Sequence, residues 1–288
     1  MNRPRGLGVS GKMATIAITG ATSGIGQAAA VALASGGHRI LLIGRDPDRG
    51  AAALAQVQLA GAEGHQLYLA DLSLVREARR LAAEIARDHP RLDVLANNAG
   101  AILPRREETA EGVERTFAID HLGAWTLTDA LLPMLRESGA RVVTTSSAAH
   151  WFARLDAEDW QLRRGWTSWR AYNNAKLMNV LMTTALRKRE PRLTALSFHP
   201  GFVRSRFGTR PEGLAGLMGV AQRLVGRSNE RGAETLVHLA TAPLPPDPAI
   251  YWADRRPART SRRATDAALA DRLWAESARL AGPVAASS

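Results

Sequence analysis

The most constraining feature of this sequence is a strand-like run near the N-terminus that passes through a glycine-rich turn into a helix-like run. Residues 15–19 are apolar and β-branched, as in a buried strand, and residues 27–34 are rich in alanine, as in a helix. Strand, glycine turn and helix in this order place backbone N–H groups and a helix N-terminus against a phosphate. We therefore expect a dinucleotide phosphate site at Gly20, Thr22, Ser23, Gly24, Ile25 and Gly26.

The rest of the chain repeats this alternation of strands and helices. Further strands are expected at 39–44, 65–70, 92–96, 141–147 and 193–198, and helices at 47–60, 73–88, 107–137 and 168–190, the third with interruptions near Gly123 and Pro133. Such alternation predicts an α/β protein with a Rossmann-like, doubly wound parallel sheet flanked by helices. We expect a single domain over residues 13–288, preceded by a flexible basic leader over residues 1–12.

The amino-acid composition excludes some kinds of chemistry and bears on the cellular location of the protein. The 288 residues include no cysteine, which excludes disulfide bonds, a thiol nucleophile and a cysteine-ligated metal, and which agrees with a cytoplasmic location. No apolar run approaches the ~18 residues expected of a membrane span.

The net charge of +11 allows two interpretations. A basic surface can bind nucleic acid or an anionic membrane, or it can simply be a solvated, arginine-rich exterior. The arginines are spread along the chain, and their densest group is Arg255, Arg256, Arg259, Arg262 and Arg263. No recognition motif for nucleic acid accompanies them, so we expect no nucleic-acid partner.

Arg45 follows the second predicted strand, where a dinucleotide fold meets the ribose of adenosine. An acid there would accept a hydrogen bond from the free 2′-hydroxyl of NAD, whereas an arginine suits the 2′-phosphate of NADP. The sequence therefore favours NADP(H) over NAD(H). Asp46 either weakens that preference or caps the helix that Pro47 begins. Asp71 either accepts a hydrogen bond from an adenine amino group or caps the helix that starts at Ser73.

Tyr172 and Lys176 are four residues apart in a predicted helix, so their side chains project as neighbours from one face. An ammonium group beside a phenol favours its ionised form and assists proton transfer at neutral pH. The same spacing also occurs on ordinary helix surfaces, but lysine is rare here and otherwise stands only at positions 12 and 188. Ser147 ends the fifth predicted strand, at the edge where ligands of open α/β sheets bind.

These motifs together resemble those of the short-chain dehydrogenases/reductases over nearly the whole chain. The matching stretches are Thr19-Gly20-x-x-x-Gly24-x-Gly26, Asn97-Asn98-Ala99-Gly100, Ser147, Tyr172-x-x-x-Lys176 and Pro200-Gly201. Each motif is modest alone, but the five in this order and spacing are specific. Residues 146–150, the long gap to Tyr172 and the ending Leu273-Trp274-x-x-Ser277 are similar to the retinol-dehydrogenase and protochlorophyllide-reductase-like branch.

The resemblance implies an oxidoreductase that passes hydride directly between nicotinamide and a substrate carbon, with no metal. Tyr172 would be the general acid in reduction and the base in oxidation, and Lys176 would support it and hold the nicotinamide ribose. Ser147 would bind the substrate oxygen, in preference to Ser146, because the family places its catalytic serine last in the strand. Further cofactor contacts are implied at Asp71, Leu72, Asn98, Ala99, Gly100, Pro200, Gly201, Val203 and Ser205.

Asp120 departs from the family pattern, which has an active-site asparagine at this position. In the family, the main-chain carbonyl of that asparagine holds a water joined to the lysine, and its side chain steadies a local helix kink. Asp120 preserves the carbonyl, but its carboxylate near Lys176 would also pair with the lysine and weaken its effect on Tyr172. Two interpretations stay open: an enzyme with altered activity, and a cofactor-binding sensor or scaffold.

Five aromatic residues between Ser147 and Tyr172 concern the substrate: Trp151, Phe152, Trp160, Trp166 and Trp169. They form either an apolar wall for a flat or lipophilic substrate or the anchor of a long insertion. We expect a lid over about 204–227 and structural roles for the isolated His150 and His199. The helices around 107–137 and 168–190 are candidates for the face of a homo-oligomer.

Overall fold

The computed structural model describes residues 13–202 and 227–282. The predicted leader (1–12), Val203, Ser205 and all of the predicted lid except Arg227 lie outside the described residues. Within them, the strands form one sheet in the order β3-β2-β1-β4-β5-β6-β7-β8. The strands are β1 (Thr15–Thr19), β2 (Arg39–Gly44), β3 (Gln66–Leu69), β4 (Val94–Asn97), β5 (Arg141–Thr145), β6 (Thr194–His199), β7 (Tyr251–Ala253) and β8 (Arg256–Pro257).

The predicted doubly wound parallel sheet is confirmed. All neighbouring strands are parallel except β7 and β8, which add a short antiparallel edge that the sequence pattern did not predict. The chain runs outward from β1 to β3, then returns to β4 on the other side of β1 and runs outward again. This reversal between β1 and β4 is where open α/β sheets bind ligands, at the carboxyl ends of the strands.

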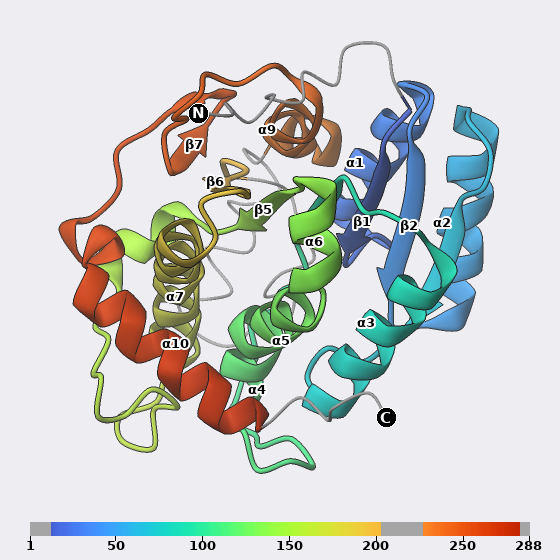
Figure 1. The fold of residues 1–288 in the computed structure, drawn as a ribbon. Helices are drawn as coiled ribbons and strands as arrows, with labels where there is room; N and C mark the ends of the chain where they lie inside the picture. The colour runs from blue at the N-terminus through green and yellow to red at the C-terminus, as the bar shows by residue number, and fades with distance from the viewer. Residues whose placement is uncertain (1–12, 203–226, 283–288) are drawn as a thin grey trace.

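Helices cover both faces of the sheet (Figure 1). Alternate residues of the central strands point to opposite faces, so that Ile16 and Ile18 pack with α1, α2 and α9, whereas Ala17 packs with α3, α5 and α6. The helices are α1 (Gly24–Ser35), α2 (Pro47–Ala60), α3 (Val75–Asp88), α4 (Arg115–Phe117), α5 (Gly123–Ala130), α6 (Leu132–Ser138), α7 (Ser168–Arg189), α9 (Asn229–Thr241) and α10 (Ala267–Ala281), with the shorter η1 (Ala118–Leu122), η2 (Ala148–Phe152) and η3 (Arg262–Thr265).

The prediction of a helix starting at residue 107 is wrong. Residues 108 and 114 instead form an isolated antiparallel bridge around a turn at Gly112, where φ is 72°. Glu114 then accepts hydrogen bonds from the backbone N–H groups of the first turn of α4, which fixes the helix start at Arg115. Turn chemistry at Gly112 therefore overrides the helical pattern of the preceding residues.

The predicted interruptions of this helical region are present. The π-helix η1 lies directly before Gly123, and a second break at Leu131 separates α5 from α6, in which Pro133 occupies the first turn. Gly123 itself permits a close approach, because a Cβ at this position would lie 2.1 Å from the carbonyl oxygen of Leu72. Within this π-helix Asp120, His121 and Leu122 are buried.

The helix pair suggested as an oligomer face is covered by the chain itself. Figure 1 shows α10 lying across α5 and α7, and its Trp274 ring packs edge-on against Trp125 of α5 at 5.3 Å between centroids. Arg189 of α7 lies over the Trp274 ring at 5.1 Å. Asp271 of α10 forms ion pairs with Lys188 and Arg189. The expectation of an exposed pair at this place is therefore wrong.

Candidate active site

The glycine turn brings the start of α1 against the end of β1. A Cβ at Gly26 would lie 2.4 Å from the carbonyl oxygen of Gly20 and 2.6 Å from Nδ2 of Asn98, so no larger residue fits without moving the backbone. At Gly24, φ is 58° and a Cβ would meet no atom within 4 Å, so the helix start is open at this point. Thr22 packs over Gly44 at the end of β2. The turn thus has the shape that close approach of a phosphate requires.

The N-terminus of α1 differs from those of the other long helices in how its amides are satisfied. Its N-cap residue, Ser23, makes no side-chain capping bond. Side chains cap the other long helices, with Asp46 on α2, Thr167 on α7, Ser228 on α9 and Asp266 on α10, while Glu111 accepts from the first amides of α3. The uncapped amides and the positive end of the helix dipole fit a diphosphate.

Arg45 directly follows β2 with an exposed side chain, on the side of the turn where the adenosine ribose is expected. Its neighbour Asp46 acts as the helix cap, since its carboxylate accepts from the backbone N–H of Arg49 at 3.0 Å and from Nε at 2.9 Å. Asp71 accepts from the backbone N–H of Ser73 at 2.9 Å and holds a turn before α3, so the predicted capping of this helix falls to Glu111 instead. The side chain of Leu72 is buried in the core.

The loop after β4 is tied to the neighbouring strands by two side chains. Thr19 Oγ1 accepts hydrogen bonds from the backbone N–H groups of Asn98 (2.8 Å) and Ala99 (2.9 Å). Asn98 donates to the Thr19 carbonyl (3.0 Å) and accepts from the Thr145 hydroxyl (3.3 Å). Asn98 thus ties the loop after β4 to the ends of β1 and β5. Sequence reasoning gave Thr19 no role of its own, although a hydroxyl at the last position of a buried strand was the signal.

Ser146 and Ser147 lie just beyond β5 and differ in their partners. The Ser146 hydroxyl donates to the backbone carbonyl of Lys176 at 2.7 Å, which fastens α7 to the end of β5. Ser147 is half-buried, and its Oγ accepts from the backbone N–H of Ala149 at 3.2 Å, so its hydroxyl hydrogen is not used in that bond. The geometry therefore leaves Ser147, and not Ser146, able to donate to a substrate oxygen.

The His150 side chain bonds the backbone of Ser147 and fixes the position of this serine. Its Nε2 accepts from the Thr260 hydroxyl (2.9 Å) and from the backbone N–H of Ser261 (3.3 Å). Nδ1 then carries the hydrogen and donates to the Ser147 carbonyl at 2.7 Å. Burial lowers the pKa of His150, which keeps the ring neutral. These bonds agree with the structural role expected for this residue.

Tyr172, Lys176 and Asp120 come together where α7 crosses the π-helix. Lys176 Nζ lies 5.3 Å from the centre of the Tyr172 ring and 3.0 Å from Oδ2 of Asp120. The lysine and aspartate side chains are 4% and 0% exposed. The other Asp120 oxygen accepts from the backbone N–H of Ala101 at 2.6 Å. Gly100 passes so close that a Cβ there would lie 3.0 Å from the lysine Nζ.

Burial and pairing act in opposite directions on this ion pair. Burial acts to lower the pKa of Lys176, but attraction to Asp120 and Tyr172 outweighs it and raises the pKa above its ordinary value. Burial raises the pKa of Asp120, and the attraction of Lys176 limits that rise. We therefore treat Lys176 as a fixed ammonium at neutral pH. The pairing anticipated for Asp120 is present, and the lysine shares its charge between a carboxylate and a phenol.

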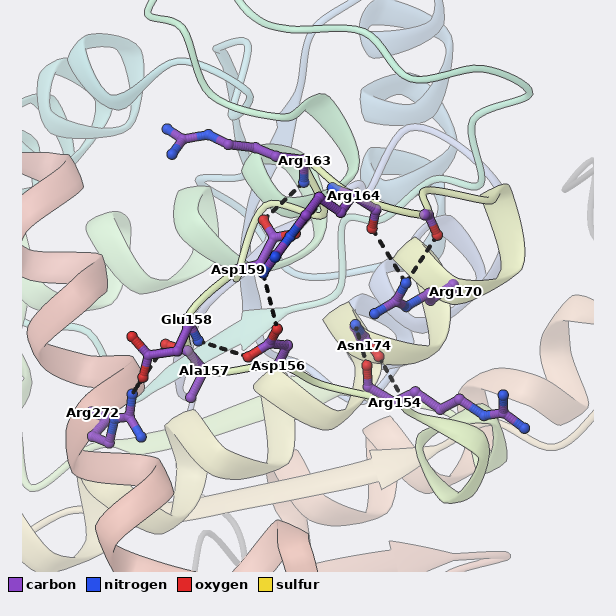
Figure 2. Close-up of polar contacts among 11 residues, drawn as sticks. Arg154, Asp156, Ala157, Glu158, Asp159, Arg163, Arg164, Arg170, Asn174 and Arg272 are labelled. Atoms are coloured by element: carbon purple, nitrogen blue, oxygen red, sulfur yellow. Dashed lines mark hydrogen bonds and ion pairs between the residues drawn. The ribbon is translucent and has the colours of Figure 1, made fainter.

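The segment between η2 and α7 is fastened by polar contacts, shown in Figure 2. Asp159 accepts from the backbone N–H groups of Arg163 (2.8 Å) and Arg164 (3.0 Å), which closes a tight loop. The Asn174 side chain bonds both backbone groups of Arg154, which joins the start of the segment to α7. Its middle is joined to α10 through an ion pair between Glu158 and Arg272 at 2.5 Å.

The aromatic residues of this region divide between the two roles that the sequence left open. Trp160 is buried in the core, and Trp166 donates from its indole nitrogen to Glu114 at 3.1 Å, so these two anchor the segment. Trp151, Phe152 and Trp169 are exposed, and the Trp169 ring packs edge-on against Tyr172 at 6.2 Å between centroids. Only these three remain available to a substrate or to another partner.

The turn after β6 is described as far as residue 202. Gly201 follows Pro200 with φ of 80°, and its backbone N–H donates to Nδ1 of His199 at 3.0 Å. His199 therefore shapes this turn, in agreement with the structural role expected for it. The cofactor contacts predicted at Val203 and Ser205 lie outside the described residues.

A groove of about 400 Å³ lies between α1 and α9 and contains none of Ser147, Tyr172 and Lys176, so we assign no chemistry to it. Over residues 13–202 and 227–282, no group of three or more histidine, aspartate or glutamate side chains is arranged to hold a metal. In that same part of the chain no helix combines the length and apolar character needed to cross a bilayer.

Fold and site together define a dinucleotide-dependent α/β oxidoreductase. The family model described as short chain dehydrogenase matches residues 14–210, and the chain belongs to this family. The chain is 35% identical over 273 residues to retinol dehydrogenase 12 of Mus musculus, covering 93% of this chain and 86% of that protein. It is 37% identical to a Streptomyces sp. (strain C5) protein with the provisional name daunorubicin C-13 ketoreductase DnrU, covering 94% and 93% of the two chains.

A solved structure shows the same fold. The crystal structure of an uncharacterised protein from Mycobacterium Paratuberculosis has a TM-score of 0.74 and 31% identity, and the match covers 96% of this chain and 97% of that one. This chain is accordingly an NAD(P)-dependent short-chain oxidoreductase that acts on alcohol and carbonyl groups. The resemblance to retinol dehydrogenases drawn from the sequence motifs is confirmed.

Proposed function

We propose that this chain transfers hydride between NADP(H) and a lipophilic alcohol or carbonyl compound, with Tyr172 as the acid and base. The observation that carries the proposal is the buried contact of Lys176 with Tyr172 and Asp120 beside the loop after β4. Burying an ammonium group is costly unless it has a task or a partner, and this one lies at the edge of the sheet where ligands bind. An uncharged residue would serve a purely structural role at lower cost.

Each residue then has a defined task. The nicotinamide supplies or accepts the hydride when it is bound. Tyr172 gives a proton to the substrate oxygen in reduction and removes it in oxidation, and the Lys176 ammonium favours the phenolate that oxidation needs. Ser147 donates its free hydroxyl hydrogen to the same oxygen and stabilises the charge that develops on it. The cofactor ribose is held by Lys176, and the diphosphate by the amides of the glycine turn.

The preference for NADP(H) rests on Arg45. Its exposed guanidinium follows β2 directly, while the adjacent carboxylate of Asp46 is engaged with Arg49 and the start of α2. A guanidinium in this place can bind a 2′-phosphate with two hydrogen bonds, whereas the 2′-hydroxyl of NAD gains little from it. A lipophilic substrate is supported by the exposed Trp169 beside Tyr172 and by the names of the relatives, which refer to retinol and daunorubicin.

The test is to titrate the purified protein with NADPH and with NADH and to follow tryptophan fluorescence. We expect tighter binding of NADPH, and we expect Arg45→Ala to remove most of that preference, by about tenfold or more, because one charged contact to the phosphate is lost. Arg192→Ala removes an exposed arginine just before β6 and is the matched control. Equal affinity for both cofactors, or an unchanged preference in Arg45→Ala, would refute the assignment of NADP(H).

A second function is favoured by one observation, the tight pairing of Asp120 with Lys176. If the carboxylate holds the ammonium away from its catalytic task, the protein would bind the cofactor without rapid turnover and act as a sensor or scaffold. Single-turnover measurements with lipophilic ketones and aldehydes distinguish the two, since the sensor binds NADPH but does not oxidise it. We favour the enzyme because Ser147, Tyr172 and Lys176 are all retained.

A further inference from the structure

One surface of the molecule combines exposed aromatic rings with arginines that have no acidic partner in the described chain. Trp151 and Phe152 at the end of η2 are 51% and 75% exposed. Around them lie Arg154, Arg259, Arg262 and Arg263, all of them exposed. We call these six residues the aromatic–arginine patch. Adjacent exposed apolar side chains with a polar rim are typical of surfaces that meet a partner or a membrane.

Hydrogen bonds bring these distant stretches of sequence together. The His150 ring, directly before Trp151, bonds Thr260 and Ser261, which lie between Arg259 and Arg262. Arg263 donates to the backbone carbonyl of Leu155 at 2.7 Å. Segments 150–155 and 259–263 therefore form one continuous surface, although about a hundred residues separate them in the chain.

Many surface arginines outside the patch form ion pairs. Arg80 pairs with both Glu77 and Glu84, and Arg279 pairs with Glu276. No ion pair to the four patch arginines occurs within residues 13–202 and 227–282. Acidic residues close to them in sequence have other partners: Asp156 pairs with Arg164 at 3.7 Å, Glu158 pairs with Arg272, and Asp266 caps α10. The patch therefore carries uncompensated positive charge.

The position of the patch connects it with the reaction site. Ser147 is the N-cap of η2, and the two rings lie at its other end, about 10 Å away at the ~2 Å rise per residue of this helix type. Aromatic rings flanked by arginines match the boundary of an anionic membrane, where rings enter the headgroup region and cations meet lipid phosphates. The net charge of +11 adds a long-range attraction to such a surface.

We propose that the aromatic–arginine patch docks this protein on the surface of an anionic lipid membrane, which brings Ser147, at the other end of η2, close to the bilayer. A substrate dissolved in the lipid then has a short path to the reaction site. Docking of this kind needs no membrane-spanning helix. It requires only reversible contact by the two rings and the four arginines.

The experiment is sedimentation of the full chain with vesicles of phosphatidylcholine alone and with phosphatidylglycerol added. We expect binding only to the anionic vesicles, weakened at high salt because the arginines lie at the surface. Trp151→Ser/Phe152→Ser and Arg259→Glu/Arg262→Glu should each lower the partition coefficient by about tenfold or more. Leu59→Ser, which changes an apolar side chain 90% exposed on α2, and Arg192→Glu are the matched controls and should bind as the parent does.

Several results would overturn the proposal. These are no vesicle binding by the parent chain, equal binding to neutral and anionic vesicles, or equal losses in the patch and control variants. A dimer that the patch variants dissociate, without vesicle binding, would assign the surface to a second copy of the chain instead. Circular dichroism of each variant shows whether it is folded. The assay needs neither cofactor nor turnover, so its outcome is independent of the proposed catalytic function.

Discussion

At the glycine turn the chain leaves the first amides of α1 without a side-chain cap, whereas around Lys176 the charged groups are bonded within the chain. The turn has open space at Gly24, and the lysine is packed against Gly100, Asp120 and Tyr172. The difference follows from the two tasks. A diphosphate brings its own charge and needs free N–H groups, whereas proton transfer needs side chains already held in position.

The largest effect is expected from Tyr172→Phe, beside the packed Lys176. Removing the hydroxyl removes the proton donor but keeps the ring that contacts Lys176 and Trp169. Turnover should fall by about 10³-fold, in the range typical of a lost general acid, while NADPH binding changes little. Steady-state rates and fluorescence titration measure the two quantities. The control is Tyr68→Phe, since Tyr68 lies on β3 and its hydroxyl bonds Asp88 and His89. This variant should retain turnover. Comparable rates for both variants would contradict the role of Tyr172.

In the glycine turn, Gly26→Ala should weaken cofactor binding by more than about tenfold. The added Cβ would lie 2.4 Å from the Gly20 carbonyl oxygen, so the turn must move and the amides lose their alignment. Gly112→Ala is the control, because there φ is 72° and alanine strains the backbone, but its Cβ would meet no atom within 4 Å. If both variants bind NADPH equally well, the geometry of the turn does not decide affinity.

Asp120→Asn tests the ion pair around Lys176. The asparagine keeps an oxygen that can accept from the Ala101 N–H, but it lacks the negative charge that pairs with Lys176. The ammonium then acts on Tyr172 alone. Alcohol oxidation, in which Tyr172 is the proposed base, should therefore be faster in the variant than in the parent chain at neutral pH. The carboxylate also raises the pKa of Lys176, so the variant should lose activity earlier at high pH, as the lysine deprotonates.

The control for this substitution is Asp266→Asn, which removes a carboxylate at the start of α10 and keeps a side chain able to cap the helix. Its oxidation rate and pH profile should match those of the parent chain. Slower oxidation by Asp120→Asn at neutral pH would show that the carboxylate assists Tyr172 and does not restrain the lysine.

The smallest effects are expected from substitutions at the N-caps of α1, which has no side-chain cap, and α10, which Asp266 caps. Ser23→Ala should leave the free energy of unfolding within about 0.5 kcal/mol of the parent, because the side chain makes no capping bond, but it should weaken NADPH binding several-fold. Asp266→Ala should do the reverse and cost about 1 kcal/mol of stability with unchanged NADPH affinity. Urea unfolding and fluorescence titration measure both. A stability loss in Ser23→Ala would show that this serine caps α1 after all.

Local sequence patterns predicted the alternation of strands and helices, the glycine turn and the pairing of Tyr172 with Lys176. These features depend on local periodicity and on spacing within one helix, which the order of residues records directly. For the same reason, the capping role of Asp46 was among the alternatives drawn from the sequence, since a cap and its helix are neighbours in the chain.

Other features became visible only in the three-dimensional structure. It gave the cap of α3 to Glu111, covered the supposed oligomer face with α10, and divided the aromatic residues into buried anchors and an exposed set. It also placed Arg259 and Arg262 beside Trp151 through His150. Each of these results joins residues far apart in sequence. Such contacts depend on how all the helices and loops pack together, and no local pattern encodes them.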